Sequence, residues 1–195
     1  MRSNAVITSI TGSPVSLQEM KIYLKLDGID DDSLVMRLIN AAVALVVKET
    51  GYALGTMTVK QTHSAFPCTK FIELDYSPIK EITTIRYKNS DGDYTVWSST
   101  EWQTALNYRP ALVGPKPNYS WPSTQTGALE SVEITYTVGG STAGDTTAPD
   151  ALRQAVMLLV AYWYENREDV ALSKTDIETA RAWRALCAPW RQIII

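Results

Sequence analysis

The stretch that decides the fold is "APDALRQAVMLLVAYWYENRED", residues 148–169. All ten side chains from Ala155 to Tyr164 are apolar or aromatic, and charged residues lie on both sides of this run. Pro149 suits the first turn of a helix, where its missing N–H costs nothing. A membrane-spanning helix needs roughly 20 apolar residues, so we predict a buried helix of a folded protein and no membrane span.

This predicted helix has two apolar faces, and each face needs a cover, because a helix that is apolar nearly all round is buried nearly all round. Either its own domain covers both faces, or its own domain covers one face and another subunit covers the other. The first face contains Leu152, Ala155, Val156, Leu159, Val160 and Trp163. The second contains Ala151, Leu158, Tyr162 and Glu165.

The composition is that of an ordinary folded protein. The chain has 195 residues, 45% hydrophobic and 20% charged, enough to bury a core in one domain or one domain with an elaboration. A net charge of −3 argues against non-specific nucleic-acid binding through a basic surface. Cys68 and Cys187 have no metal or redox spacing, and the N-terminus lacks the apolar segment of a signal peptide. We therefore expect reduced thiols and a cytoplasmic protein.

Residues 14–55 are predicted to form an N-terminal helical hairpin. Ser16 and Glu19 have the spacing of a capping box at the start of the first helix. The second helix is predicted to end at Gly51, because glycine suits the left-handed residue that follows a helix. The core-facing stripe of this second helix is expected to be Leu34, Leu38, Ala41, Leu45 and Val46.

Residues 56–138 have a β pattern. In "VEITYTV", residues 132–138, apolar and polar side chains alternate strictly. The stretch "ITTIRYKNSDGDYTVW" predicts a hairpin around residues 89–93, and "MTVKQTHSAF" and "KFIEL" predict two further strands. We therefore predict an inserted antiparallel β module with one solvated face.

Residues 148–195 return to a helical pattern. The apolar helix is followed by a break, a further helix stopped by Pro189, and the apolar tail "WRQIII". These C-terminal helices are expected to pack on the N-terminal hairpin, because a two-helix hairpin alone has too small a core. The predicted fold class is α+β, with a helical base of about four helices and an inserted antiparallel β module.

The sequence predicts neither a catalytic site nor a site for a cofactor or metal. His63 is the only histidine and is expected at the surface or at the edge of a strand. No nucleophile elbow and no glycine-rich phosphate loop is present. Asp27, Asp30, Asp31 and Asp32 form an acidic cluster, but the spacing of a calcium loop is missing. We expect this cluster to cap the following helix and to be solvated.

The six tryptophans are expected to serve cores and interfaces. A single-strand nucleic-acid site would need a basic groove beside the aromatic rings, but the lysines and arginines are dispersed along the chain. The six are Trp97, Trp102, Trp121, Trp163, Trp183 and Trp190.

Several motifs follow one another in a specific order: "SLQEMKIYLKLDGIDDDSLVMRLINAAVALVVKETGYAL", "IELDYSPIKEITTIRYKNSDGDY", "VEITYTVGG", "APDALRQAVMLLVAYWYENRE" and "RALCAPWR". This order, over residues 14–191, resembles the phage head–tail connector family, the neck adaptor proteins beneath the portal. The most specific parts are the two ends of the apolar helix and the closing segment at residues 185–191. Cys187 stands where an aliphatic residue is more usual, which exchanges one small buried apolar group for another.

The resemblance implies a structural virion protein that is not an enzyme and needs no cofactor. It implies a homo-oligomeric ring, dodecameric like the portal, through whose lumen the genomic DNA passes without specific binding. The implied partners are the portal protein and the next neck or tail component, with no membrane. The implied location is the neck of the virion, after assembly in the host cytoplasm.

Three sets of residues are candidates for contacts in such a ring. The candidate subunit interface is Tyr162, Tyr164 and Leu158. The candidate lumenal rim is the acidic cluster Asp27, Asp30, Asp31 and Asp32, since DNA passage requires weak contacts with phosphates. The candidate portal contact is Trp190, Arg191, Ile193, Ile194 and Ile195. The alternative for the last three is that they fold back over the subunit's own helices.

A function of a different class stays open at this point. A monomeric or dimeric protein with a β module on a helical base would recognise a peptide or a sugar without catalysis. In that protein, the second face of the apolar helix would be covered internally. The oligomeric state in solution at several concentrations distinguishes the two classes.

Overall fold

The computed structural model describes residues 3–125, 127–139, 148–166 and 174–192. The chain forms two compact units. The β unit contains residues 1–10, 56–139 and 192–195, and the helical unit contains residues 11–55 and 140–191. The predicted α+β class, with four α-helices and an antiparallel β module, is confirmed.

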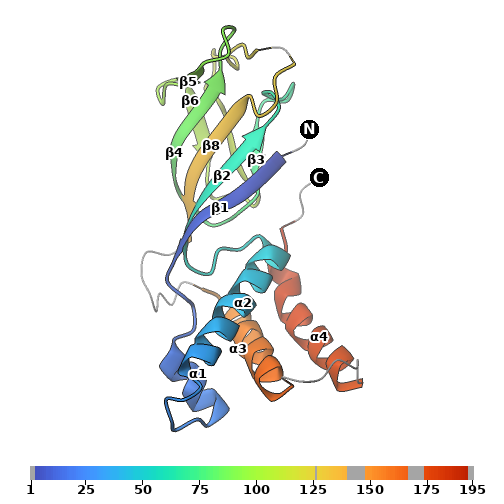
Figure 1. Ribbon diagram of the computed structural model, residues 1–195. Helices are drawn as coiled ribbons and strands as arrows, with labels where there is room; N and C mark the ends of the chain where they lie inside the picture. The colour runs from blue at the N-terminus through green and yellow to red at the C-terminus, as the bar shows by residue number, and fades with distance from the viewer. Residues whose placement is uncertain (1–2, 126, 140–147, 167–173, 193–195) are drawn as a thin grey trace. The chain divides into compact units, whose positions relative to one another are not determined.

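The helical unit consists of α1 (Leu17–Leu24), α2 (Asp32–Thr50), α3 (Asp150–Glu165), α4 (Lys174–Cys187) and the short 3₁₀ helix η1 (Ala188–Trp190) (Figure 1). As predicted, the Ser16 hydroxyl accepts a hydrogen bond from the Glu19 N–H at the start of α1. Gly51 ends α2 in the left-handed conformation, with φ 66°. Helix α3 packs against both α2 and α4, so segments from both ends of the sequence build one core.

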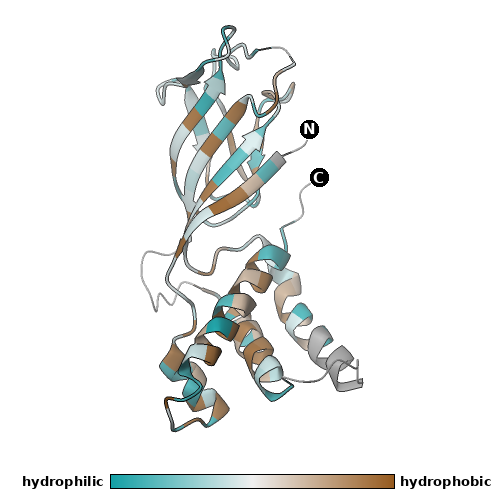
Figure 2. Ribbon diagram, viewed as in Figure 1, coloured by the Kyte–Doolittle hydropathy of each residue, from teal (hydrophilic) through white to brown (hydrophobic). Residues whose placement is uncertain are grey.

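The core-facing stripe of α2 differs from the prediction. Ala41 is exposed and Leu34, Leu38 and Leu45 are half-buried, whereas Val46 is buried as expected. The prediction failed because α2 has apolar residues on more than one face (Figure 2), including the half-buried Leu34, Leu38 and Leu45, so spacing alone did not identify the buried face. The buried positions are Val35, Ile39, Ala42, Val43, Val46, Val47 and Thr50.

Two antiparallel sheets form the β unit. The five-stranded sheet has the order β1 (Ser3–Thr11), β2 (Thr56–His63), β8 (Val132–Val138), β4 (Ile79–Lys88), β5 (Tyr94–Val96). The three-stranded sheet has the order β3 (Ile72–Leu74), β7 (Ala111–Pro115), β6 (Trp102–Ala105). Figure 1 shows β8 between β2 and β4, where it is paired on both sides.

The predicted alternation in β8 and the predicted hairpin are both present. Val132, Ile134, Tyr136 and Val138 are all fully buried. Strand β4 pairs with β5 through a turn in which the Asn89 side chain accepts from the backbone N–H groups of Asp91 and Asp93. Gly92 has φ +91° in this turn, a conformation that explains the Asp-Gly signal in the sequence.

Three strands escaped prediction: β1, β6 and β7. Gly114 and Pro115 of β7 lower its strand propensity. Gly114 is nevertheless required there, because a Cβ at this position would lie 2.3 Å from the Lys70 carbonyl oxygen. The backbone just before β3 therefore lies directly against β7. Gly114 allows this close contact and does not interrupt the strand.

Both cysteines are free thiols, one in each unit. Cys68 is exposed in the β unit, and Cys187 is buried at the end of α4. Burial raises the pKa of the Cys187 thiol to about 11.

Candidate functional site

The candidate site lies on α3, the helix that gave the clearest signal in the sequence. Its first apolar face is the core of the helical unit, where Leu152, Ala155, Val156, Leu159 and Val160 are buried. Trp163, predicted to belong to this face, is only half-buried. It lies near the C-terminal end of α3, two residues before the helix ends at Glu165.

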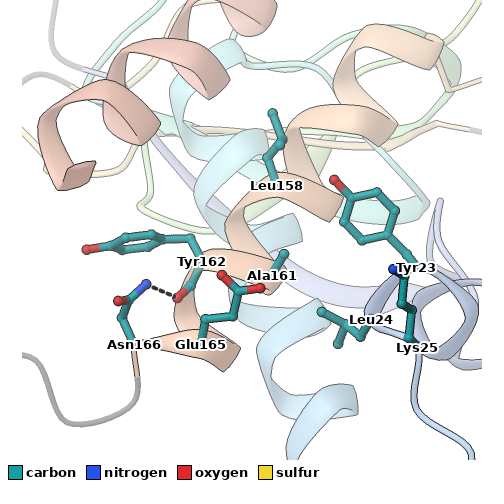
Figure 3. Close-up of a pocket in the computed structure, with 8 residues that line it drawn as sticks. All are labelled: Tyr23, Leu24, Lys25, Leu158, Ala161, Tyr162, Glu165 and Asn166. Atoms are coloured by element: carbon teal, nitrogen blue, oxygen red, sulfur yellow. Dashed lines mark hydrogen bonds between the residues drawn. The ribbon is translucent and has the colours of Figure 1, made fainter.

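The second face of α3 borders a pocket. The pocket has a volume of about 490 Å³ and lies between the end of α1 and the C-terminal half of α3, as Figure 3 shows. We call it the α1–α3 pocket; its lining is Tyr23, Leu24, Lys25, Leu158, Ala161, Tyr162, Glu165 and Asn166. Two of the predicted interface residues, Leu158 and Tyr162, therefore line one pocket, and both are half-buried in the single chain.

The end of α1 shapes the other wall of this pocket. Lys25 caps α1 in the left-handed conformation with φ 58°, and its N–H donates to the Ile22 carbonyl. The next N–H, of Leu26, donates back to the Lys21 carbonyl at 2.9 Å, so the chain turns sharply here. Tyr23, which lines the pocket, is 39% exposed, and Ile22, its neighbour in the sequence, is 69% exposed.

The lining combines apolar and polar groups. Leu24, Leu158 and Ala161 supply apolar surface, while Lys25 and Glu165 supply opposite charges. The Asn166 amide donates to the Tyr162 carbonyl at 2.9 Å, which ties the last turn of α3 (Figure 3). A side chain with an apolar body and a polar end would therefore fit this pocket.

Tyr164, the third predicted interface residue, is not part of this pocket. Its hydroxyl donates to the carboxylate of Asp31 at the start of α2, so the two residues connect α3 to α2 within the subunit. The spacing of the sequence did not reveal this pair, because Tyr164 and Asp31 are 133 positions apart.

The acidic cluster is only partly solvated. Asp27 and Asp30 are exposed, whereas Asp32 forms an ion pair with Lys21 at 2.7 Å. Asp31 is the N-cap residue of α2, but its side chain makes no capping hydrogen bond, because it accepts from Tyr164 instead. The predicted capping role is therefore wrong for the Asp31 side chain. In the described part of the chain, no three acidic, histidine or cysteine side chains are grouped to hold a metal ion.

The start of the C-terminal segment has partners inside the chain. The Trp190 ring meets the Tyr52 ring edge to face, with centroids 5.4 Å apart. Arg191 forms an ion pair with Glu49 near the end of α2. The Gln192 amide donates to the Leu74 carbonyl in the β unit at 2.7 Å. Ile193, Ile194 and Ile195 lie outside the described residues.

His63 is buried, which corrects the prediction of a surface or edge histidine. It is 6% exposed at the end of β2, and burial lowers its pKa to about 4. Its Nε2 lies 3.2 Å from the Gln61 amide nitrogen, and the carbonyl oxygen of the same amide accepts from the Tyr136 hydroxyl. The prediction failed because β2 buries every second residue, and its buried side includes the polar Gln61 as well as His63.

A charged triplet in the five-stranded sheet was also missed. Glu133 of β8 is 3% exposed and forms ion pairs with both Lys60 of β2 and Arg86 of β4. Burial alone would raise the pKa of Glu133, but hydrogen bonds and charges from Lys60 and Arg86 outweigh it and hold the pKa below its usual range. The alternation in β8 predicted that Glu133 faces away from the apolar core, but it did not predict burial under two longer side chains.

The aromatic residues of the β unit form a cluster. Phe66 stacks on Trp121 with centroids 4.8 Å apart and meets Trp97 at 5.8 Å. The Trp97 indole N–H donates to Glu101, and the Trp121 indole N–H donates to the Thr69 carbonyl. This packing supports a core role for these two tryptophans.

Within the described residues, no helix combines the length and hydropathy needed to cross a membrane.

Comparisons with known proteins agree with the motifs. The family model of the head completion protein matches residues 15–176. None of the curated proteins matches the sequence. A chain in the neck of an empty gene transfer agent (GTA) particle, computed with C6 symmetry, superposes with a TM-score of 0.80 at 24% identity, covering 100% of this chain and 97% of the other.

Two related structures give a similar result. A chain in the virion of a native GTA particle has 25% identity and a TM-score of 0.77, with 100% and 97% of the two chains covered. A chain in the neck of the native particle, computed with C12 symmetry, has 24% identity, a TM-score of 0.77 and the same coverage. The resemblance to head–tail connectors is thereby confirmed, and the chain belongs to the head completion protein family.

Proposed function

We propose that this protein is a structural component of the head–tail neck, in which it forms a closed ring beneath the portal and joins the head to the tail. The observation that carries the proposal is its likeness, over 100% of its length, to chains in the neck of a particle. Membership of the head completion protein family supports the same role.

The α1–α3 pocket is the proposed contact between neighbouring subunits. A cyclic ring needs a heterologous contact, in which two different surfaces of each subunit meet. The pocket offers one such surface, because Leu158 and Tyr162 in its lining remain half-buried and Tyr23 in its lining is 39% exposed. Side chains of the adjacent copy would fill the pocket, and the pair Lys25 and Glu165 would set their orientation. Tyr164 would act indirectly, by holding α3 against α2.

A ring of twelve is the proposed stoichiometry. The likeness to a neck chain from a structure computed with C12 symmetry supports this number, and the C6 symmetry of the other neck structure is contained in C12. The proposed lumenal rim is the acidic cluster, in which Asp27 and Asp30 are exposed. A rim with negative charge repels DNA phosphates, so the genome passes without attractive contacts that would have to be broken at each step.

The C-terminal segment from Trp190 to Ile195 is the proposed portal contact. Trp190 and Arg191 are held on the helical unit by Tyr52 and Glu49, which would leave Ile193–Ile195 as the part that contacts the portal. The next neck or tail component would bind elsewhere, and assembly would take place in the host cytoplasm. We propose no cofactor, no membrane and no specific DNA binding.

The test is to mix the purified protein with its portal and to image the complex. We expect class averages with a twelve-fold ring on one face of the portal. Light scattering of the free protein at several concentrations gives the oligomeric state without the portal. A protein that stays monomeric and leaves the portal bare in these images would contradict the proposal and favour a peptide- or sugar-binding module.

A further inference from the structure

The first strand of the β unit has one open edge. Strand β1 is nine residues long, Ser3–Thr11, and lies at the end of the five-stranded sheet beside β2 (Figure 1). It is fixed to β2 by side-chain bonds as well, from Thr8 to the Thr58 carbonyl and from Thr62 to the Asn4 carbonyl. Among the described residues, no strand pairs with its outer side. Every second residue of β1 therefore points its backbone N–H and C=O outward.

Among the described residues, strand β1 itself lacks charge, proline and short length, three of the usual protections against pairing. Proteins protect an open edge with charged residues, proline, bulges or a very short strand. The sequence of β1, "SNAVITSIT", has no charge and no proline. Val6 is 50% exposed and Ile10 is 52% exposed. Because these two residues are four positions apart, they lie on the same face of the strand and form a small stripe with the Thr8 side chain between them.

The opposite edge of the same sheet is protected. Strand β5 has only three residues, Tyr94–Val96. The Tyr94 ring lies under two cations, Arg86 and Lys88, each 5.4 Å from its centroid, and its hydroxyl donates to the Glu130 carbonyl. The two edges thus differ in both length and charge. Of these two edge strands, only β1 is long enough to pair with a further strand along its whole length.

We propose that the outer edge of β1 binds an extended segment of a different neck protein, which adds a sixth strand to the sheet. The inference rests on the proposed function. The row of outward backbone groups fixes the occupant as a β-strand, since only a strand satisfies donors and acceptors at this spacing. The stripe of Val6 and Ile10 selects a segment with apolar, β-branched residues at alternate positions.

A second copy of this chain is the less suitable occupant for two reasons. Pairing of β1 with β1 would be two-fold and would end at a pair, whereas a ring needs contacts related by a rotation that continues. Pairing of β1 with the neighbour's β5 would leave most of β1 uncovered, because β5 has three residues against nine. A segment from another neck protein has neither restriction.

The test places a photo-crosslinking amino acid, p-benzoylphenylalanine, at position 6 of the full chain, in necks purified from particles. We expect a crosslink to an extended segment of another neck protein, identified by mass spectrometry of the joined peptides. Hydrogen exchange of residues 3–11 is expected to slow in the neck relative to the free protein. A crosslink to a second copy of this chain, or unchanged exchange with no crosslink, would overturn the proposal.

Two variants separate this inference from the proposed function. Val6→Lys with Ile10→Lys puts charges on the open edge, and Val96→Lys puts a charge on an equally apolar, 60% exposed position at the other edge. We expect the double variant to bind the crosslinked partner about tenfold more weakly while still forming a ring on the portal, and the control to bind it normally. Equal binding by both would refute the strand-addition model. If the unmodified protein does not join the neck at all, the proposed function is refuted, and the inference with it.

Discussion

The helical unit and the β unit use their side chains in opposite ways. In the helical unit the core is almost entirely apolar, and the apolar surface of α3 exceeds what the unit buries, since Leu158 and Tyr162 border an open pocket. In the β unit the buried set includes Gln61, His63 and Glu133, and each of these has a specific partner. We propose that the two units use these groups differently: the surplus apolar surface of α3 is available for the contact with a neighbouring subunit, and the buried polar pairs fix the pairing of strands.

The largest effect on stability is expected from a comparison of the two faces of α3, in which one leucine on each face is replaced by alanine. Leu152→Ala should lower the free energy of unfolding by about 2 to 5 kcal/mol, because Leu152 is fully buried and its loss leaves a cavity. Leu158→Ala should lower it by less than about 1.5 kcal/mol, because Leu158 is only half-buried at the pocket. Urea unfolding of both variants measures the difference. Equal losses would mean that both faces of α3 belong to the core, and the comparison would fail.

The second prediction concerns the buried histidine of the β unit. His63 has a folded pKa of about 4, below the ordinary value near 6.5, so the folded state binds a proton less readily than the unfolded state. Its contribution to stability is complete above about pH 6.5 and is lost as the pH falls toward 4, by at most about 1.4 kcal/mol per pH unit. Urea midpoints at pH 7.0, 5.5 and 4.5 measure this loss. His63→Gln should flatten the dependence between pH 6.5 and 4.5, and an unchanged slope would contradict the assignment.

The third prediction tests the charged triplet. Arg86→Met removes one of the two cations that contact Glu133 and should cost about 2 kcal/mol, since a nearly buried carboxylate then keeps only Lys60. Lys80→Met on the same strand, at an exposed position, is the matched control and should change stability by less than about 0.5 kcal/mol. Guanidinium chloride would screen the charges, so urea is the suitable denaturant. Similar losses for both variants would show that Glu133 does not depend on its partners.

The fourth prediction separates the two parts of the C-terminal segment. Deletion of residues 193–195 should leave the melting temperature unchanged and abolish portal binding. Deletion of residues 190–195 should lose portal binding and also about 1 to 2 kcal/mol of stability, because it removes the ring contact with Tyr52 and the ion pair with Glu49. Thermal unfolding followed by circular dichroism and a portal pull-down measure the two effects. If the shorter deletion lowers the melting temperature and spares portal binding, these residues cover the subunit itself.

The smallest expected effect on stability belongs to the pocket. Tyr162→Asp should change the free energy of unfolding by less than about 1 kcal/mol but should prevent ring closure, because it places an unpaired charge in an apolar contact. Tyr108→Asp, at a position 64% exposed in the β unit, is the control. Electron microscopy of portal complexes counts the rings. A folded Tyr162→Asp variant that still forms rings would remove the α1–α3 pocket from the interface.

The sequence predicted those elements whose signal is local. Ser16 and Gly51 mark helix ends through chemistry within a few residues, and the alternation in β8 identifies its inner face without other information. The face of α2 could not be predicted, because Leu34, Leu38 and Leu45 satisfy the same spacing as the residues that are buried. Strand β1 was missed because residues 3–11 contain no turn signal on their N-terminal side and bond to residues fifty or more positions away.

The candidate site was predictable in part. The second face of α3 was visible as Leu158 and Tyr162 in the helical spacing, but the opposite wall at Tyr23 and Lys25 depends on how α1 ends. The Tyr164–Asp31 pair and the Lys60–Glu133–Arg86 triplet join segments distant in sequence. Pairs of this kind arise from tertiary packing, and no local pattern in a single sequence predicts them.

The two thiols differ in exposure, so their labelling rates can report the opening of the helical unit. A maleimide reacts with thiolate, so at neutral pH it should label the exposed Cys68 quickly. Cys187 is both buried and held protonated by its pKa of about 11, and it should react only when the end of α4 opens. The delay between the first and second label in a mass spectrum would therefore time the local unfolding of the helical unit in the unmodified chain, without any engineered cysteine.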